Sequence, residues 1–379
     1  MQCFDVAVVG AGPAGAVAAR DLASAGARVA LLDASHPREK PCGGGVTGRA
    51  LARAAVHADG GRAIETVRFE AGGRCAAVSL ADRTSLRVFS RETFDAALLR
   101  EAREAGAQLV PRRVQHCARV DGRWTLRTSG GGEIGAAWLL GADGCGGLVR
   151  RQVFRPFERR QLSIAAGSYV DGVDADEIVI AFVDDPRGYL WSFPRAGHLA
   201  VGTCAQADET STAQMHAVTD RWLDQYAPAA GRRRRRYAWP IPSLTVADLN
   251  QERPSGDGWM LLGDAAGLVD PITREGIFFA IASGRLAAAS LATATPAAAY
   301  AERVREELHG ELRRAARLKL GFYRPRFTRL LIEALGRSGA IRTVMADLVA
   351  GVQPYAGLKR RLVATGEIWL MLRLLTTPS

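Results

Sequence analysis

A glycine-rich turn close to the start of the chain constrains the fold more than any other feature. The pattern predicts a buried strand at residues 4–9, an alanine-rich helix at 13–25 and a second strand at 28–32. The turn between the first strand and the helix reads Gly10-Ala11-Gly12-Pro13-Ala14-Gly15. Parallel strands joined by a helix form a βαβ unit, so the chain is predicted to have an α/β fold.

The spacing of this turn is that of a dinucleotide site. Gly10 permits the tight turn, Gly12 lets the backbone approach a pyrophosphate, and Gly15 lets the helix pack on the strand. The helix that begins at Pro13 offers free N–H groups and a partial positive charge to phosphates. Asp33 ends the second strand, where an acid commonly binds ribose hydroxyls. The same glycine spacing recurs at 43–48 and 130–135 outside a βαβ unit, and the latter is expected to be a hairpin turn.

Two later motifs favour a flavin over a nicotinamide. Gly263-Asp264 follows a predicted strand, and a carboxylate at a strand end can bind a ribityl chain. A helix predicted from about residue 275 directs the N–H groups of Gly276 and Ile277 at the flavin pyrimidine edge, where reduction places negative charge. Asp143 lies after another predicted strand. Each motif alone fits an ordinary strand-to-turn junction, but the three in this order predict non-covalently bound FAD.

The order of these motifs, with Arg91 at a helix start, resembles the two-dinucleotide-domain flavoproteins of the p-hydroxybenzoate hydroxylase type. Within that superfamily, residues 40–45 (KPCGGG), 189–194 (YLWSFP) and 263–271 (GDAAGLVDP) resemble the geranylgeranyl reductase family. The resemblance covers residues 1–290. It implies that Val114 meets the adenine through its backbone and that a further set of residues binds FAD: Ala14, Asp33, Cys42, Gly43, Gly44, Arg91, Asp264, Gly276 and Ile277.

The resemblance also implies a substrate tunnel. Cys42 would lie in the loop over the flavin, and Tyr189 and Trp191 would line the tunnel, so these three are the candidate catalytic residues. Cys42 is equally compatible with a small loop residue, and the two aromatics with ordinary sheet packing. The chain departs from the family at Asp33, where Glu is common, and at Arg274, where a small residue is common.

The function implied is a reductase that saturates C=C bonds of a polyprenyl substrate. Hydride from the reduced flavin would reach one alkene carbon and a proton the other, with NAD(P)H or a ferredoxin-like carrier as the transient reductant. The FAD motifs are shared with monooxygenases that act on aromatic or peptide-like substrates. A halogenase fits less well, because its WxWxIP motif is matched only by YLWSFP. A non-catalytic prenyl-binding chaperone resembling the Rab escort proteins is a third alternative.

The pattern divides the chain into four parts. Residues 1–160 are expected to form the first part of an FAD-binding domain with inserted strands, and residues 256–300 its second part. Residues 161–255 alternate as strands do and are the expected substrate domain. Residues 301–379 are expected to be helical. The predicted fold is therefore a Rossmann-like FAD-binding fold with a β-rich substrate domain and a helical C-terminal region.

The amino-acid composition narrows the classes of partner that are expected. The net charge of +11 rests on 50 basic residues, of which only Lys40, Lys319 and Lys359 are lysines. This arginine bias indicates a GC-rich coding sequence, so no nucleic-acid partner is expected. An apolar or prenylated substrate is favoured, with peripheral membrane contact as an option. The run Arg232–Arg236 is expected to be a solvated loop, with a diphosphate or lipid-headgroup site as the alternative.

The six scattered cysteines form no CxxC pair, which is typical of reduced thiols in the cytoplasm. The six histidines do not recur at ligand spacing, so no metal is expected. No targeting segment is recognised, and the uncharged run 286–301 is too short and too polar to span a bilayer. We expect a cytoplasmic protein, with peripheral attachment to the membrane as an option. The sequence leaves the oligomeric state open.

Overall fold

The computed structural model describes residues 1–80, 86–227 and 234–367, and its N-terminal part is built on a largely parallel sheet. Along this sheet the strand order is β17-β18-β11-β1-β2-β8, with the β9–β10 hairpin attached to β11. The strands are β1 (Gln2–Val9), β2 (Val29–Leu32), β8 (Gln108–Val110), β9 (Val114–Val120), β10 (Arg123–Thr128), β11 (Glu133–Gly141), β17 (Ser255–Gly256) and β18 (Trp259–Leu261).

The register of this sheet brings the sequence motifs together. β1 runs parallel to β2 and to β11, so Val9 lies opposite both Leu32 and Gly141. β11 in turn runs parallel to β18, with Gly141 opposite Leu261. The carboxyl ends of all four strands therefore meet at one edge, which is where ligands bind in open α/β sheets. The predicted βαβ unit and the α/β fold class are confirmed.

A second, mixed sheet carries the strand order β16-β12-β15-β14-β13-β5-β6. Most of its strands come from residues 162–242, but β5 and β6 come from the N-terminal third and join through the parallel β13–β5 pair. The strands are β5 (Thr66–Ala71), β6 (Arg74–Ser79), β12 (Leu162–Asp171), β13 (Ile178–Val183), β14 (Gly188–Arg195), β15 (His198–Gln206) and β16 (Arg234–Pro242). A separate small sheet consists of β3 (Gly45–Val46), β7 (Arg87–Val88) and β4 (Arg62–Ala63).

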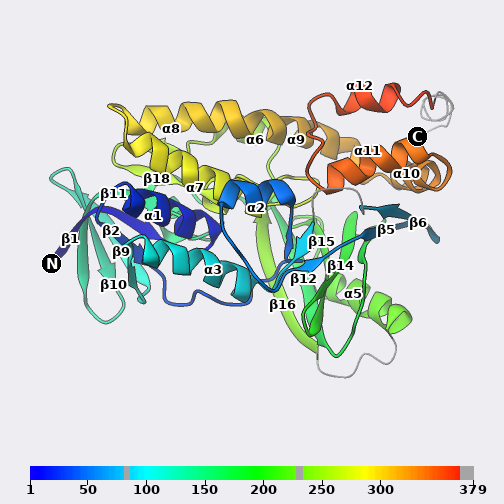
Figure 1. Cartoon of the computed structure of the whole chain (residues 1–379), viewed down its shortest axis with the longest axis horizontal. Coiled ribbons are helices and arrows are strands. Elements are labelled where there is room, and N and C mark those ends of the chain that lie inside the picture. Colours follow the sequence, from blue (N-terminus) through cyan, green and yellow to red (C-terminus); the bar gives the residue numbers. More distant parts are fainter. Residues whose placement is uncertain (81–85, 228–233, 368–379) are drawn as a thin grey trace.

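Helices cover both sheets and connect them. The helices before residue 292 are α1 (Pro13–Ser24), α2 (Gly48–Ala54), α3 (Arg91–Glu104), α4 (Leu148–Val153), α5 (Thr212–Tyr226), α6 (Val246–Gln251) and α7 (Ile277–Leu291), with short 3₁₀ turns η1 (Arg159–Gln161) and η2 (Gly263–Ala266). α8 (Pro296–Val304), the π-helical turn η3 (Arg305–His309) and α9 (Gly310–Phe322) follow one another without a break. This rod runs along the top of Figure 1 from the first sheet towards the second. Tyr300 anchors its near end through a hydrogen bond from its hydroxyl to the Leu261 carbonyl, 2.8 Å.

The C-terminal helices close the molecule over the second sheet. α10 (Pro325–Arg337) packs on β5 and β6, α11 (Gly339–Val349) packs on β6, and α12 (Leu358–Val363) follows (Figure 1). Residues 301–367, the described part of the region 301–379, are thus mainly helical, as expected. Among the described residues, no helix combines the length and the apolar character that crossing a membrane requires. The domain boundaries at 160, 255 and 300 stay predictions.

Two local expectations need correction. The hairpin turn expected at 130–135 lies between β10 and β11, but a turn at Asp121-Gly122 that the sequence analysis did not predict adds β9, so residues 114–141 form three strands. Residues 234–236 of the arginine run lie in β16 and not in a loop, while Arg232 and Arg233 lie outside the described residues. Arg234 pairs with Asp224 at 2.8 Å, and Arg236 with Asp220 at 2.7 Å. Carboxylates of α5 therefore pair with two of the three described arginines of this run.

Candidate cofactor and substrate site

A cavity of about 340 Å³ lies where the two large sheets meet, a volume typical of small-molecule sites. One side is formed by the turn after β1, the loop 40–45, the turn after β18 and the start of α7. The other side is formed by the second sheet and by the C-terminal helices. The cavity therefore joins the predicted FAD-binding motifs to the predicted substrate region.

The turn after β1 is closely packed except at Gly12. A Cβ atom on Gly15 would lie 1.9 Å from the carbonyl oxygen of Gly10, and one on Gly10 would lie 2.3 Å from the Ala142 carbonyl oxygen. A Cβ atom on Gly12 would meet only His36 Nε2, at 3.7 Å. Gly12 is also the N-cap of α1, and no side chain caps that helix. The free N–H groups of α1 therefore face an open space suited to a phosphate group.

A second helix start faces the same cavity. Gly276 is the N-cap of α7 and has no side-chain cap, and a Cβ atom there would lie 3.2 Å from Asp264 Oδ1. Burial raises the pKa of Asp264, while the nearby Lys40 and Arg91 act in the opposite direction. Two uncapped helix starts and a partly buried carboxylate in one cavity suit the phosphates, the ribityl chain and the isoalloxazine of FAD.

Arg91 belongs to a buried network of charged side chains. Its guanidinium binds both oxygens of Asp95, at 3.0 and 2.8 Å. Burial opposes its charge, but Asp95 and then Cys42 raise the pKa of Arg91. His36 places Nε2 3.5 Å from Asp95 and Nδ1 2.7 Å from Asp33. Burial opposes ionisation of Asp33, but the hydrogen bond from His36 lowers its pKa. The network fixes Arg91 at the cavity wall.

The loop over the cavity is held by two residues that the sequence analysis missed. Arg195, at the end of β14, is fully buried and donates to the carbonyls of Gly43 and Cys42. It also pairs with Glu39, which accepts hydrogen bonds from Ser90 Oγ at 2.6 Å and from the Arg91 N–H at 3.1 Å. Arg195 directly follows the YLWSFP motif, and this position is the one sequence signal that could have identified it.

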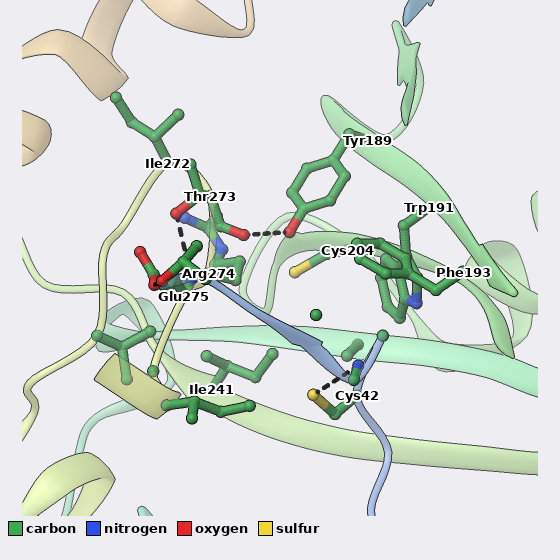
Figure 2. Close-up of a pocket in the computed structure, with 18 of the residues that line it drawn as sticks. Cys42, Tyr189, Trp191, Phe193, Cys204, Ile241, Ile272, Thr273, Arg274 and Glu275 are labelled. Atoms are coloured by element: carbon green, nitrogen blue, oxygen red, sulfur yellow. Dashed lines mark hydrogen bonds between the residues drawn. The ribbon is translucent and has the colours of Figure 1, made fainter. Parts of the chain in front are cut away.

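Aromatic side chains form the opposite wall (Figure 2). Tyr189 and Trp191 of β14 line the cavity together with Cys204 of β15. The Tyr189 hydroxyl donates to the Thr273 carbonyl at 2.8 Å. The Tyr189 ring also stacks on Tyr323, with 6.2 Å between the ring centroids, which is within the range of aromatic pairs. Tyr189 thus joins β14 both to the segment that leads into α7 and to the end of α9.

The expected site residues separate into two groups. Most of them line the cavity: Gly12, Pro13, Ala14, Cys42, Gly43, Gly44, Arg91, Tyr189, Trp191, Gly263, Asp264, Gly276 and Ile277. The others do not line it: Gly10, Gly15, Asp33, Val114 and Asp143. Asp143 accepts the Val149 N–H at 3.0 Å, at the start of α4. Both carboxylate oxygens of Asp33 accept hydrogen bonds from protein groups, including the N–H of Ala11 at 2.9 Å and that of Ser35 at 2.7 Å.

The C-terminal part of the chain contributes cavity residues that belong to no recognised sequence motif. These residues are Phe322, Tyr323, Leu331, Met345, Leu348, Val349 and Tyr355. Most of them lie on amphipathic helices, and an amphipathic pattern predicts burial but not the partner.

Comparison with known proteins identifies the family. A model of the family described as FAD binding domain matches residues 3–317. The chain belongs to this family. As an FAD-binding-domain protein with reductases among its relatives, it is an FAD-dependent oxidoreductase, which confirms the expected cofactor and enzyme class.

Individual relatives of this flavoprotein also support the assignment to reductases. It is 30% identical to a digeranylgeranylglycerophospholipid reductase of Methanothrix thermoacetophila, over 86% of this chain and 88% of that protein. It is 28% identical to a menaquinone reductase of Mycolicibacterium smegmatis, over 94% of this chain and 97% of the relative. Its fold matches a geranylgeranyl bacteriochlorophyll reductase-like protein of Thermoplasma acidophilum, with a TM-score of 0.77, 22% identity and coverage of 96% and 100%. The resemblance to the geranylgeranyl reductase family is confirmed.

Asp264 provides a direct test of the cofactor site. We expect Asp264→Ala to weaken FAD binding by about 1.5–3 kcal/mol, because the variant loses a partly buried carboxylate that we propose accepts a hydrogen bond from the ribityl chain. Titration of apo-protein with FAD, followed by flavin fluorescence, measures the change. Asp224→Ala, at an exposed carboxylate that pairs with Arg234, is the matched control and should bind FAD as the wild type does. An unchanged affinity in Asp264→Ala would mean that the ribityl chain lies elsewhere.

Proposed function

We propose that this oxidoreductase reduces carbon–carbon double bonds in the isoprenoid chain of its substrate. The observation that carries the proposal is the apolar wall facing the FAD motifs. Its side chains come from three strands and two C-terminal helices: Val67, Phe69, Ile178, Ile180, Phe182, Phe193, Leu331, Met345 and Val349. An isoprenoid chain offers almost no polar groups, so a site that binds it must be apolar along most of its length. Relatives named for the reduction of geranylgeranyl compounds support the same substrate class.

The reaction requires a hydride equivalent and a proton. FAD held by the turn after β1, Asp264 and the start of α7 would, once reduced, supply the hydride equivalent for one alkene carbon, and the other carbon would take up a proton. The protein's own residues hold the alkene and exclude water, which supplies much of the rate enhancement for a poor hydride acceptor. We propose NAD(P)H or a ferredoxin-like carrier as the transient reductant. Measurement of flavin bleaching with each reductant under anaerobic conditions tests this choice.

Cys42 is the proposed catalytic residue of the loop. It lines the cavity, and its sulfur accepts a hydrogen bond from the Gly44 N–H at 3.2 Å (Figure 2). We expect Cys42→Ala to retain FAD but to lower turnover, or to change how many double bonds are reduced, because the thiol is the reactive side chain of this loop. Product analysis under single-turnover conditions measures both effects. Unaltered kinetics would show that Cys42 is a small loop residue without a catalytic role.

The reductase and the monooxygenase alternatives need the same FAD site, so the requirement for molecular oxygen is what distinguishes them. We expect the reduced protein to saturate an isoprenoid alkene under strictly anaerobic conditions. We also expect no label in the product when the reaction is run under isotopically labelled oxygen. Labelled product, together with no anaerobic turnover, would favour the monooxygenase.

A peripheral membrane contact is a further part of this proposal. Leu318 and Leu320 of α9 and Leu362 and Val363 of α12 are exposed, and basic residues of α12 accompany the latter pair. Exposed apolar and basic side chains together suit an anionic lipid surface. Co-flotation with vesicles that contain anionic lipid tests the contact, and absence of the protein from the vesicle fraction would contradict it.

A further inference from the structure

Arg274 is a cation inside the cavity that has no carboxylate partner among the described residues. It lines the cavity one residue before Glu275, at the approach to α7. Its Nε and Nη1 atoms are buried and have no hydrogen-bond partner. The neighbouring carboxylate of Glu275 pairs instead with Arg49. A buried guanidinium without an anion is unfavourable unless a ligand completes the pair.

The surroundings of Arg274 do not neutralise its charge. Its guanidinium carbon lies 5.9 Å from the centre of the Tyr323 ring, and the side chains of Cys204 and Tyr189 also act on its charge. The pKa of Lys319 is lowered to about 8, first by burial and then by the positive charge of the nearby Arg274. Asp270 lies in the same turn. Burial raises the pKa of Asp270 and outweighs the charge of Arg274, which acts to lower it, and Asp270 Oδ1 accepts the N–H groups of Ile272 and Thr273 at 2.7 and 3.0 Å. Arg274 therefore has no ion-pair partner among the described residues at this end of the cavity.

The backbone at Arg274 has a conformation that disfavours arginine. Its φ of 60° lies in the left-handed region, which disfavours side chains other than glycine. Such strain is commonly found where a side chain serves a function. Glycine would fit this turn more easily, so packing of the turn does not explain the arginine.

We propose that Arg274 binds a carboxylate group carried by an otherwise apolar substrate. The planar guanidinium presents two parallel N–H donors that match the two oxygens of a carboxylate. A diphosphate carries more charge than this one side chain can balance, and the other lining cations, Lys40 and Arg91, lie beside Asp264 and Asp95. This inference adds a chemical feature of the substrate to the proposed function. It rests on that function in one respect, which is that the substrate binds in this cavity.

A matched pair of probes tests the proposal without turnover. Farnesoic acid and farnesol share one apolar chain and differ in the carboxylate, which alone can form a charge-assisted pair with the guanidinium. We expect the acid to bind the FAD-loaded wild type about 10- to 100-fold more tightly than the alcohol, equivalent to about 1.4–2.7 kcal/mol. Calorimetric titration at neutral pH measures both affinities, and Trp191 in the cavity wall provides a fluorescence signal.

The Arg274→Gly variant should lose this preference while it keeps its affinity for farnesol. Glycine suits the left-handed backbone, and the flavin absorbance of the variant shows whether FAD and fold are retained. Arg274→Lys should keep part of the preference, and Arg317→Gln, at an exposed arginine of α9, should keep all of it. Equal affinities in the wild type, no binding of the acid, or an undiminished preference in Arg274→Gly would each overturn the proposal. Failure of anaerobic alkene reduction with an intact acid preference would contradict only the proposed function.

Discussion

Replacing Gly12 with leucine should give a folded protein that no longer retains FAD. The position tolerates a side chain within the protein, because a Cβ atom there meets only His36 Nε2 at 3.7 Å and the backbone φ of −70° is ordinary. The leucine would instead fill the space in front of α1 that a pyrophosphate needs. We expect FAD affinity to fall at least ~100-fold, equivalent to about 2.7 kcal/mol.

Two companion variants make this result specific. Gly336→Ala introduces a Cβ atom that meets nothing within 4 Å, in α10, and should leave FAD binding unchanged. Gly15→Ala places a Cβ atom 1.9 Å from the Gly10 carbonyl oxygen and should impair folding itself. Flavin content after purification and the far-ultraviolet circular dichroism of each variant distinguish the cases. A Gly12→Leu protein that is yellow and binds FAD normally would refute the assignment of the pyrophosphate site.

Replacing Glu252 with alanine should lower the free energy of unfolding by about 3–5 kcal/mol, because removal of one partner leaves the other charge of a buried ion pair without compensation. Arg150 is fully buried and binds both oxygens of Glu252, at 2.7 and 3.0 Å, while it also donates to the Ala265 carbonyl at 2.9 Å. The variant leaves this guanidinium buried without its anion. The same arginine holds the turn that carries Asp264.

Urea unfolding of the FAD-free protein measures this effect, since bound FAD would itself add stability by mass action. Asp224→Ala, which breaks the partly exposed pair with Arg234, is the control and should change the free energy of unfolding by less than about 1 kcal/mol. We further expect Glu252→Ala to bind FAD more weakly, because the turn after β18 loses its support. Equal stabilities of Glu252→Ala and Asp224→Ala would show that the buried pair contributes no more than a surface pair.

The cofactor half of the site could be predicted from the sequence because its parts are local. The glycine spacing at 10–15, the strand before it and the helix after it lie within one βαβ unit, so periodicity and turn chemistry suffice to identify them. The later motifs at Asp264 and Gly276 follow the same logic, because each joins a strand end or helix start to a neighbouring turn. The carboxyl edge of a parallel sheet then brings them together.

The substrate half could not be predicted in this way. Its wall combines β5 from the N-terminal third, β14 and β15 from the middle, and α9–α11 from the C-terminal end. An amphipathic pattern shows that each element has a buried face, but not which other element that face contacts. For the same reason, the arginine run was expected in a loop, although residues 234–236 lie in a strand and α5 supplies carboxylates to two of them.

The sequence alone therefore determined the fold class, the cofactor and the edge of the sheet where the FAD motifs gather, since these depend on short-range spacing. Only the tertiary structure decided which side chains surround the cavity and which charges there are neutralised. Arg195 and Arg274 illustrate the difference: each is an arginine close to the FAD motifs with buried guanidinium atoms. The first pairs with Glu39, 156 residues away in sequence, whereas the second forms no ion pair among the described residues. Charge balance in a buried site depends on contacts between distant segments, and these exist only once the chain has folded.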